Sequence, residues 1–248
     1  MSLRDVLLVI AGGLVAGAAN TIAGGGSLLS FPLLVVLGLP PLAANVTNTV
    51  GIVPAAVGGA IGFRSELVAQ KGRLLGLLPF AGVGAIGGGV LLLTTPARAF
   101  SQVVPLLIVL ACAMLLLQRR IADSLVGRQG RQAWLLRAGT FATGVYGGYF
   151  GAAVSVLILA LMAVTIADTL PRLNALKVPL AGTMNLVSGI VFAFLAPVHW
   201  GYVLVLAPST LVGGRVGAAL ARHIPAQVLR VVVVVLGLGA AAWLEFSQ

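Results

Sequence analysis

Long apolar runs, separated by short polar or glycine-rich breaks, make up almost the whole chain. Most of them hold about 18 to 22 residues without a charge, enough for a helix to cross roughly 30 Å of hydrocarbon. Lipid cannot satisfy open backbone groups, so each run is predicted to be helical. The chain is therefore predicted to be an all-α, polytopic membrane protein. The expected segments are 6–22, 26–38, 43–62, 74–94 and 99–118, then 134–151, 152–166, 174–196, 201–221 and 226–244.

Composition agrees with a chain that lies in a bilayer. Hydrophobic residues make up 60% and charged residues 8% of the 248 residues, and the mean hydropathy is +1.13. A water-soluble domain could not hide so much apolar surface in one core. Alternating ten-residue strands do not occur in the sequence, which argues against a transmembrane barrel. The first apolar run is read as a membrane helix instead of a signal peptide, because no cleavage site precedes a polar domain.

The order of features in the first half of the chain returns in the second half. Each half begins with an apolar segment that ends in glycines, Ala23-Gly-Gly-Gly-Ser27 in the first and Tyr146-Gly-Gly-Tyr-Phe-Gly151 in the second. A short apolar run, a turn with proline and a polar helix start follow in both halves. We therefore expect two repeats of five segments, 1–118 and 134–248, joined by a basic cytoplasmic linker over 119–133.

Basic residues indicate that the two repeats are inverted. The loop 64–73 carries three basic residues, whereas its counterpart 196–201 carries none. The contrast is reversed in the loop after the fourth segment, which carries Arg98 alone in the first half but Arg222 and Arg230 in the second. Basic loops stay on the cytoplasmic side, so a cytoplasmic linker places both termini outside. The net charge of +10 is thus read as a topology signal and not as a nucleic-acid surface.

The glycine clusters are the first candidates for a binding site. Inverted repeats broken by glycine at matching positions are typical of secondary transporters that bind substrate near mid-membrane. Each break is expected to leave helix N–H groups unpaired, and these can hold an anion. Close helix packing is the alternative explanation for a cluster, as it is for the small residues at 84–89 and 213–217. The candidates are Gly24, Gly25, Gly26 and Ser27 in the first half, and Gly147, Gly148 and Gly151 in the second.

Polar side chains near the breaks supply further candidates. Amides and hydroxyls can donate hydrogen bonds to an oxyanion, but bonding between helices would use the same groups. Lys177 could neutralise a substrate anion, or it could extend to the cytoplasmic interface. Tyr146 and Tyr149 could bind substrate or wedge the hairpin. The other candidates are Asn20, Asn45, Thr47, Asn48, Asn174 and Asn185.

Several function classes are disfavoured. All five acidic residues lie in predicted loops or near the ends of the chain, so a proton relay through intramembrane carboxylates is not expected. Uniport, coupling through the substrate's own proton and a neutral Na⁺ site stay open. The sequence has no catalytic motif, Walker A sequence or metal-ligand cluster, so we expect no enzyme activity, no cofactor and no metal. Cys112, the single cysteine, is predicted to be a packed core thiol.

Two sets of motifs stand at matching places in the halves. The first half carries Ala23-Gly-Gly-Gly-Ser-Leu-Leu-Ser-Phe-Pro32, then Gly38-Leu-Pro-Pro41 and Thr47-Asn48. The second carries Gly144-Val-Tyr-Gly-Gly-Tyr-Phe-Gly151 and Asn174-Ala-Leu-Lys177. Over nearly the whole chain, these motifs resemble those of the sulfite exporter TauE/SafE family.

The resemblance implies a membrane protein that moves sulfite or an organosulfonate, usually outward. Two departures bear on the substrate. Thr49 stands where the family usually has the lysine of Thr-Asn-Lys, and Gly151-Ala-Ala-Val stands where many members have Gly-Pro-Gly. The binding residues that the resemblance implies are Gly24 to Ser27, Thr47, Asn48, Tyr146 to Gly148, Asn174 and Lys177.

Together, the pattern and the resemblance predict a multi-pass inner-membrane transporter of a small anion that works by alternating access. Its expected partners are the anionic substrate and the lipid bilayer, without nucleic acid, and a homodimer is one option for its assembly. Two alternatives stay open. One is a membrane subunit that needs a partner protein, and the other is a transporter of a different small anion such as thiosulfate.

Overall fold

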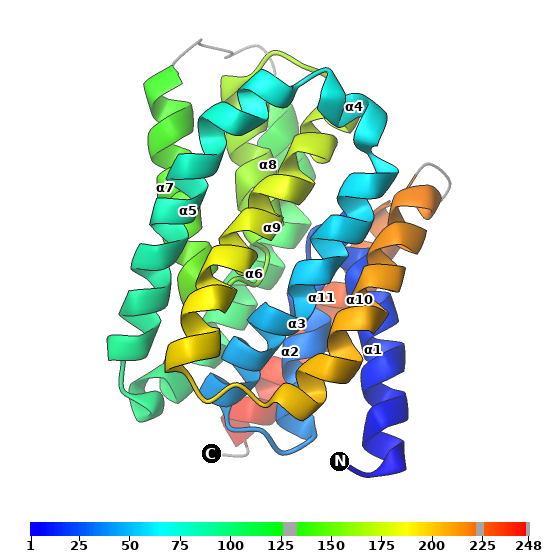
Figure 1. Ribbon diagram of the computed structural model, residues 1–248, viewed down its shortest axis with the longest axis vertical. Helices are drawn as coiled ribbons and strands as arrows, with labels where there is room; N and C mark the ends of the chain where they lie inside the picture. Colours follow the sequence, from blue (N-terminus) through cyan, green and yellow to red (C-terminus); the bar gives the residue numbers. More distant parts are fainter. Residues whose placement is uncertain (126–132, 222–225, 247–248) are drawn as a thin grey trace.

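The computed structural model describes residues 1–125, 133–221 and 226–246 (Figure 1). Within these ranges the chain forms eleven helices and no strand, which confirms the all-α class. All ten predicted segments are helical, and α4 is a short addition. The bounds are α1 Leu3–Ile22, α2 Ser27–Val36, α3 Pro41–Gly62, α4 Arg64–Val68, α5 Lys71–Thr94, α6 Ala97–Leu125, α7 Ala133–Tyr149, α8 Val154–Thr165, α9 Leu170–Leu195, α10 Trp200–Leu220 and α11 Ala226–Phe246.

Local sequence explains several helix ends. At the start of α1, the Ser2 hydroxyl accepts the Asp5 N–H at 3.2 Å, and the Asp5 carboxylate accepts the Ser2 N–H at 2.7 Å. This reciprocal pair is a capping box. Pro41 and Pro171 lie in the first turns of α3 and α9, where a missing N–H costs no helical bond. α6 continues to Leu125, beyond the end of its apolar run, so the first part of the expected linker is helical.

Helix length separates full membrane spans from partial ones. α2 and α8 have 10 and 12 residues, so they extend only about 15–18 Å. They are apolar but too short to cross the hydrocarbon layer. The described helices therefore define a multi-pass membrane protein with two short intramembrane helices. The six long spans are Leu3–Ile22, Pro41–Gly62, Lys71–Thr94, Ala97–Leu117, Pro171–Leu195 and Trp200–Leu220.

Helix contacts come in matched pairs. α1 packs on α10 as α7 packs on α5, and α1, α2 and α3 contact one another as α7, α8 and α9 do. α11 contacts α2 as α6 contacts α8, while α3 meets α9 and α6 meets α11. The α1–α2 hairpin enters from the end of the molecule that holds both termini, and the α7–α8 hairpin enters from the end that holds α4 (Figure 1). Two helical hairpins thus enter from opposite ends.

Glycine makes the closest helix contacts. A Cβ on Gly84 or Gly88 of α5 would meet the backbone of α7 at the carbonyl oxygens of Phe141 and Val145. On α10, Gly213 is pressed in the same way against the backbone of α1. Close packing, as expected for these small-residue stretches, is confirmed. A larger residue at such a position would force the two helices apart.

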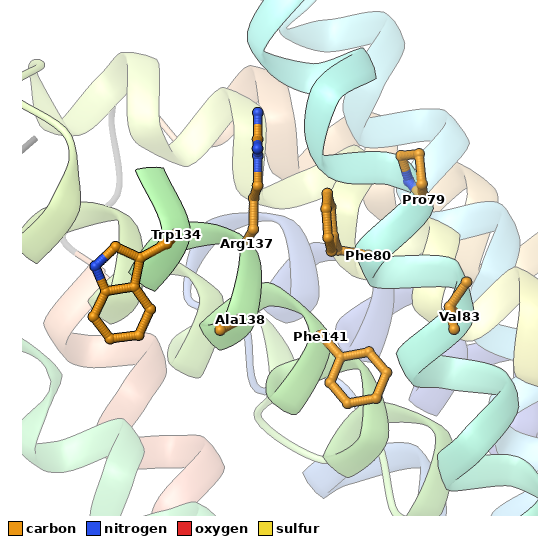
Figure 2. A pocket seen from close by; sticks show the side chains of 7 residues that line it. All are labelled: Pro79, Phe80, Val83, Trp134, Arg137, Ala138 and Phe141. Carbon is orange, nitrogen blue, oxygen red and sulfur yellow. The ribbon is translucent and has the colours of Figure 1, made fainter. Parts of the chain in front are cut away.

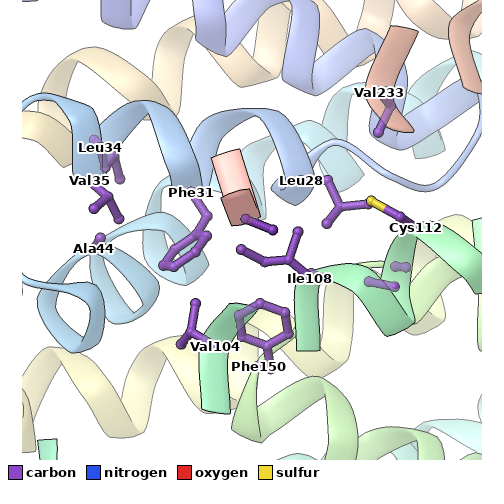
Figure 3. Packing of buried hydrophobic residues seen from close by; sticks show 14 of the residues in the cluster. Leu28, Phe31, Leu34, Val35, Ala44, Val104, Ile108, Cys112, Phe150 and Val233 are labelled. Carbon is purple, nitrogen blue, oxygen red and sulfur yellow. The ribbon is translucent and has the colours of Figure 1, made fainter. Parts of the chain in front are cut away.

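An apolar cluster joins α2 and α6 to the second hairpin (Figure 3). The rings of Phe31 and Phe150 meet edge to face, with centroids 5.7 Å apart, and the rings of Phe100 and Tyr149 do so at 5.9 Å. Such pairs add about 0.5–1.5 kcal/mol to the gain from burial alone. Cys112 lies in the same cluster at 1% exposure, so the predicted core thiol is confirmed. This packing fixes the position of the break between α7 and α8.

Candidate substrate site

The helices before the two breaks, α1 and α7, end in the same way. Gly24 donates its N–H to the Ala19 carbonyl at 2.9 Å, and Gly151 donates to the Tyr146 carbonyl at 3.3 Å. Both bonds join residues five apart, one residue wider than an α-helical bond, a turn that occurs at the ends of helices. The two glycines have φ of +90° and +74°, a region in which a Cβ would be strained. One positive-φ glycine therefore terminates the first helix of each hairpin.

The second break lies later in the chain than the sequence suggested. Gly147 and Gly148 were expected at the break, but they lie inside α7. Gly148 faces the Ala85 carbonyl on α5, and a Cβ on Gly147 would lie 2.9 Å from the Val154 side chain. Helix packing explains both glycines, and their N–H groups belong to the helix. Of the three second-half candidates, Gly151 alone is at the break.

Ala153 departs from the pattern of glycine at turns. It precedes α8 with φ of +58°, the left-handed conformation that costs an L-residue roughly 1–2 kcal/mol. It is also the third residue of Gly151-Ala-Ala, where the resemblance led us to expect Gly-Pro-Gly. The chain thus holds an alanine in a conformation suited to glycine, directly beside the second break.

Unpaired backbone N–H groups gather where the hairpins meet. A Cβ on Gly24 would lie 2.8 Å from the Ser155 Cβ and 3.4 Å from the Val156 nitrogen, so the two breaks are adjacent. Free N–H groups before a helix carry partial positive charge and attract anions. Within the described ranges, no acceptor is bonded to the N–H groups of Gly25, Gly26 and Ser27 at the first break, or of Ala152, Ala153 and Ser155 at the second.

Lys177 on α9 is fully buried, at 0% exposure. Its Nζ lies 3.5 Å from the Thr21 carbonyl oxygen, in the last turn of α1 before the first break. No carboxylate among the described side chains pairs with it, and Arg230 adds a second positive charge to its surroundings. The alternative that Lys177 extends to the membrane interface is wrong. A buried ammonium is costly without a counter-charge, so its position favours an anionic ligand.

Asn45 on α3 extends to the break of the other hairpin. Its Nδ2 donates to the Tyr149 carbonyl oxygen at 3.1 Å. Its Oδ1 is buried and has no hydrogen-bond partner among the described residues. Thr49, which stands where the family usually has lysine, donates its hydroxyl to the Asn45 carbonyl at 2.9 Å and brings no charge. The long central helix of each half thus sends a polar side chain to the hairpin of the other half.

Two other predicted residues are engaged in bonds between helices. The Ser30 hydroxyl donates to Asn48 Oδ1 at 2.5 Å, which links α2 to α3. The Thr47 hydroxyl oxygen accepts the His199 N–H at 3.0 Å, which links α3 to the start of α10. These bonds match the alternative that both side chains link helices. Each bond uses an oxygen as the acceptor and leaves the Asn48 N–H groups and the Thr47 hydroxyl hydrogen out, so a binding role for these donors stays a prediction.

Both predicted tyrosines hold the second hairpin together. The Tyr146 hydroxyl donates to the Ala152 carbonyl oxygen at 2.8 Å, across the break. Tyr149 contributes its carbonyl to Asn45 and packs its ring on Phe100. These contacts agree with the alternative that Tyr146 and Tyr149 wedge the hairpin in place.

Three more predicted amides lie near the breaks. Asn20 is half-buried, and its Cβ would be 2.7 Å from a Cβ on Gly26. Asn185 is 4% exposed, and its Oδ1 would be 3.5 Å from a Cβ on Gly151. Asn174 is half-buried one turn before Lys177. Their role in binding stays a prediction.

Charged residues tie the halves together at the α4 end, in a cluster that we call the inner latch. Arg73 pairs with Asp168 at 2.9 Å, and Arg172 pairs with the same carboxylate at 3.4 Å. Gln70 donates to the Arg172 carbonyl oxygen at 3.0 Å. Burial alone would raise the pKa of Asp168, but bonds from Arg73 and the Thr169 N–H, with the charge of Arg172, lower it below 3.8. Sequence reasoning missed this cluster.

Neutral hydrogen bonds tie the halves at the opposite end, in what we call the outer latch. His199 bonds Thr47 there, as described above, and the Tyr202 hydroxyl donates to the Leu37 carbonyl oxygen at 3.4 Å. His199 directly precedes α10 as Gln70 directly precedes α5, so loops at corresponding places in the two halves form the two latches. Only the inner latch contains ion pairs among the described residues.

Two apolar grooves lie away from these residues. One, of about 660 Å³, lies between α5 and α7 (Figure 2), and the other, of about 610 Å³, lies among α1, α2 and α11. None of the predicted binding residues lines either groove. The candidate site is therefore the junction of the two breaks, in the interior of the helix bundle.

Two broken hairpins in a multi-pass bundle are typical of membrane transporters. The family described as sulfite exporter TauE/SafE matches residues 9–244, so the chain belongs to the TauE/SafE family, and the predicted resemblance is confirmed. Relatives include a probable membrane transporter protein of Haemophilus influenzae, 25% identical over 95% of this chain and 92% of the relative. The probable membrane transporter protein YfcA of Escherichia coli K12 is 28% identical over 99% and 91%. No solved structure matches the chain significantly.

Proposed function

We propose that this chain exports a small anion, sulfite or an organosulfonate, across the inner membrane by alternating access. The observation that carries the proposal is Lys177, a fully buried lysine whose Nζ has the Thr21 carbonyl as its hydrogen-bond partner. A substrate anion would supply the missing counter-charge. The adjacent N–H groups at the two breaks would share its remaining oxygens.

The unpaired Asn45 Oδ1 refines the choice of substrate. Leaving a buried acceptor unsatisfied costs about 1–3 kcal/mol, so a ligand with a donor is favoured beside it. Hydrogen sulfite carries both a negative charge and a proton, and an aminosulfonate carries N–H donors. Either ligand would place its charge toward Lys177 and its donor toward Asn45. Hydrogen sulfite would also take its own proton across the membrane.

Basic residues support the orientation of the proposed exporter. Arg64, Lys71, Arg73 and Arg137 start helices or lie near their starts at the α4 end (Figure 1). Arg4 and Arg98 lie at the starts of α1 and α6, at the end that holds both termini. The rule that basic loops stay inside assigns the α4 end to the cytoplasm.

The matched helix contacts and the oppositely directed hairpins support two inverted repeats. In such a transporter, each latch closes one access path to the same central site. Opening the inner latch would admit the anion from the cytoplasm, and opening the outer latch would release it. Alternating access would result if one latch stays closed while the other is open.

Flux into liposomes that contain only this protein tests the proposal. We expect saturable transport of sulfite or of one sulfonate, and Lys177→Met should weaken binding of that anion about ten- to hundred-fold because a charge-assisted bond is lost. Lys71→Met is the matched control, because Lys71 is the chain's other lysine and is exposed at the start of α5. Unchanged affinity in Lys177→Met would remove this residue from the site. Flux that needs an added partner protein would favour the subunit alternative.

A further inference from the structure

The groove between α5 and α7 carries a charge that substrate binding does not use. Arg137 on α7 is exposed, and its Cζ lies 5.8 Å from the centroid of the Phe80 ring on α5. Trp134, one turn earlier on α7, is 67% exposed. The other residues that line the groove are apolar. The groove therefore combines an apolar lining with one positive charge, on Arg137, and one exposed indole ring, on Trp134.

Helix packing explains why the groove opens there. Farther from the α4 end, Gly84 and Gly88 bring α5 and α7 into backbone contact. Nearer that end, Phe80 of α5 and Phe141 of α7 line the groove between the two helices. Figure 2 shows Arg137 extended beside the Phe80 ring, toward the start of α7.

Arg137 is poised to bind an anion from the membrane side. Among the described residues, the ion pairs involve Arg73 and Arg172, and none involves Arg137. Its contact with the Phe80 ring face holds the guanidinium in place and leaves the N–H donors available for a ligand. Arg137 is in the second turn of α7, so a bilayer that covers the apolar helices is expected to bring its phospholipid head groups close to this residue.

We propose that this groove is a binding site for an anionic phospholipid, with the phosphate on Arg137, the head group beside Trp134 and an acyl chain between Phe80, Val83 and Phe141. Basic pockets between transmembrane helices on the cytoplasmic side bind anionic head groups, and exposed tryptophan is favoured at that depth. The second groove provides an internal contrast. Apolar residues and glycine alone line it, so it should accept lipid tails without regard to head-group charge. The proposal does not depend on the identity of the transported substrate.

Native mass spectrometry of the full, delipidated chain tests this site. Phosphatidylglycerol and phosphatidylcholine with the same acyl chains would be titrated separately, and the first bound lipid measured. We expect the wild type to prefer phosphatidylglycerol about five-fold, which is the usual contribution of one arginine near the membrane surface. Arg137→Gln should abolish the preference. Arg137→Lys should keep most of it, which distinguishes loss of charge from misfolding.

Arg98→Gln is the matched control, because it removes an arginine at the opposite end of the bundle and should leave the preference intact. A phosphatidylglycerol preference that survives in Arg137→Gln would overturn the proposal, as would a wild type without any preference. Inorganic phosphate should fail to displace the lipid. Displacement by phosphate would show that the groove binds a free anion instead of a phospholipid.

Discussion

Neutralising Asp168 should open the path that we propose leads to the cytoplasm, because this carboxylate pairs with Arg73 across the inner latch. Asp168→Asn keeps the size of the side chain and an oxygen that can accept the Thr169 N–H. It removes the charge that binds Arg73 and Arg172. The side chain of Asp168 is 8% exposed, but those of Arg73 and Arg172 are 37% and 43% exposed, so solvent screens both pairs.

The magnitude follows from that exposure. Only the Arg73 pair joins the two halves, since Asp168 and Arg172 lie four residues apart around the start of α9. A pair with one exposed partner contributes up to about 1 kcal/mol, so its loss should shift the equilibrium toward the inward-open state by up to about 1 kcal/mol. This corresponds to an open population up to about five times larger. Arg73→Gln should produce about the same shift, and the double variant should add little to Asp168→Asn, because both changes remove the same interaction.

Accessibility of a buried cysteine would report the opening. Thr21→Cys, in a Cys112→Ala background, places a thiol at a position that is 1% exposed and whose carbonyl bonds Lys177. A membrane-impermeant thiol reagent, added to inside-out vesicles, should react up to about five times faster after Asp168→Asn. Asp5→Asn, at the other end of the bundle, should leave the rate unchanged. An unchanged rate in Asp168→Asn would refute the role of the inner latch.

Three further predictions concern pH and the breaks. The pKa of Asp168 is lower in the folded protein than its ordinary value of 3.8, so the charged side chain stabilises the fold fully above pH 3.8. This stabilisation is lost as the pH falls through the pKa of the folded state. The difference in Tm between wild type and Asp168→Asn should therefore vanish in stronger acid. Gly24→Ala and Gly38→Ala share the positive-φ cost of about 1–2 kcal/mol, but only Gly24 also meets a neighbour, Ser155, at 2.8 Å. Gly24→Ala should therefore lower Tm more and impair flux, and equal losses would contradict this reasoning. Ala153→Gly should relieve strain of about 1–2 kcal/mol against an entropic cost of about 0.4–1 kcal/mol, so Tm should rise or stay level, and a clear fall would count against the strained turn.

Hydropathy was sufficient to predict the helices, because a bilayer requires long continuous apolar stretches. It missed α4, Arg64–Val68, which is too short and too polar to leave such a signal. It also ended the fifth segment at 118, although α6 continues to Leu125, because helical bonding does not stop where the apolar residues stop. The rest of the expected linker, 126–132, lies outside the described residues.

Local sequence could not determine the details of the site. Glycine serves both a helix break and a close helix contact, so the pattern alone could not separate Gly147 and Gly148 from Gly151. Lys177 was equally compatible with the interior and the interface until its neighbours were known, and the Thr21 carbonyl, 156 residues away, settles the question. The inner latch could not be predicted for the same reason. Arg73 and Asp168 are 95 residues apart in the sequence, and neither lies in a motif.

The crossed contacts at the breaks have a consequence for how the chain is made. The Asn45 amide emerges from the ribosome 104 residues before the Tyr149 carbonyl that it bonds, and the Thr21 carbonyl emerges 156 residues before Lys177. The first hairpin thus enters the membrane before its partners exist. The first five segments would have to wait in the membrane, with α1 and α2 incompletely docked, until α7 and α9 arrive. Each half would then complete its folding only through contacts with the other.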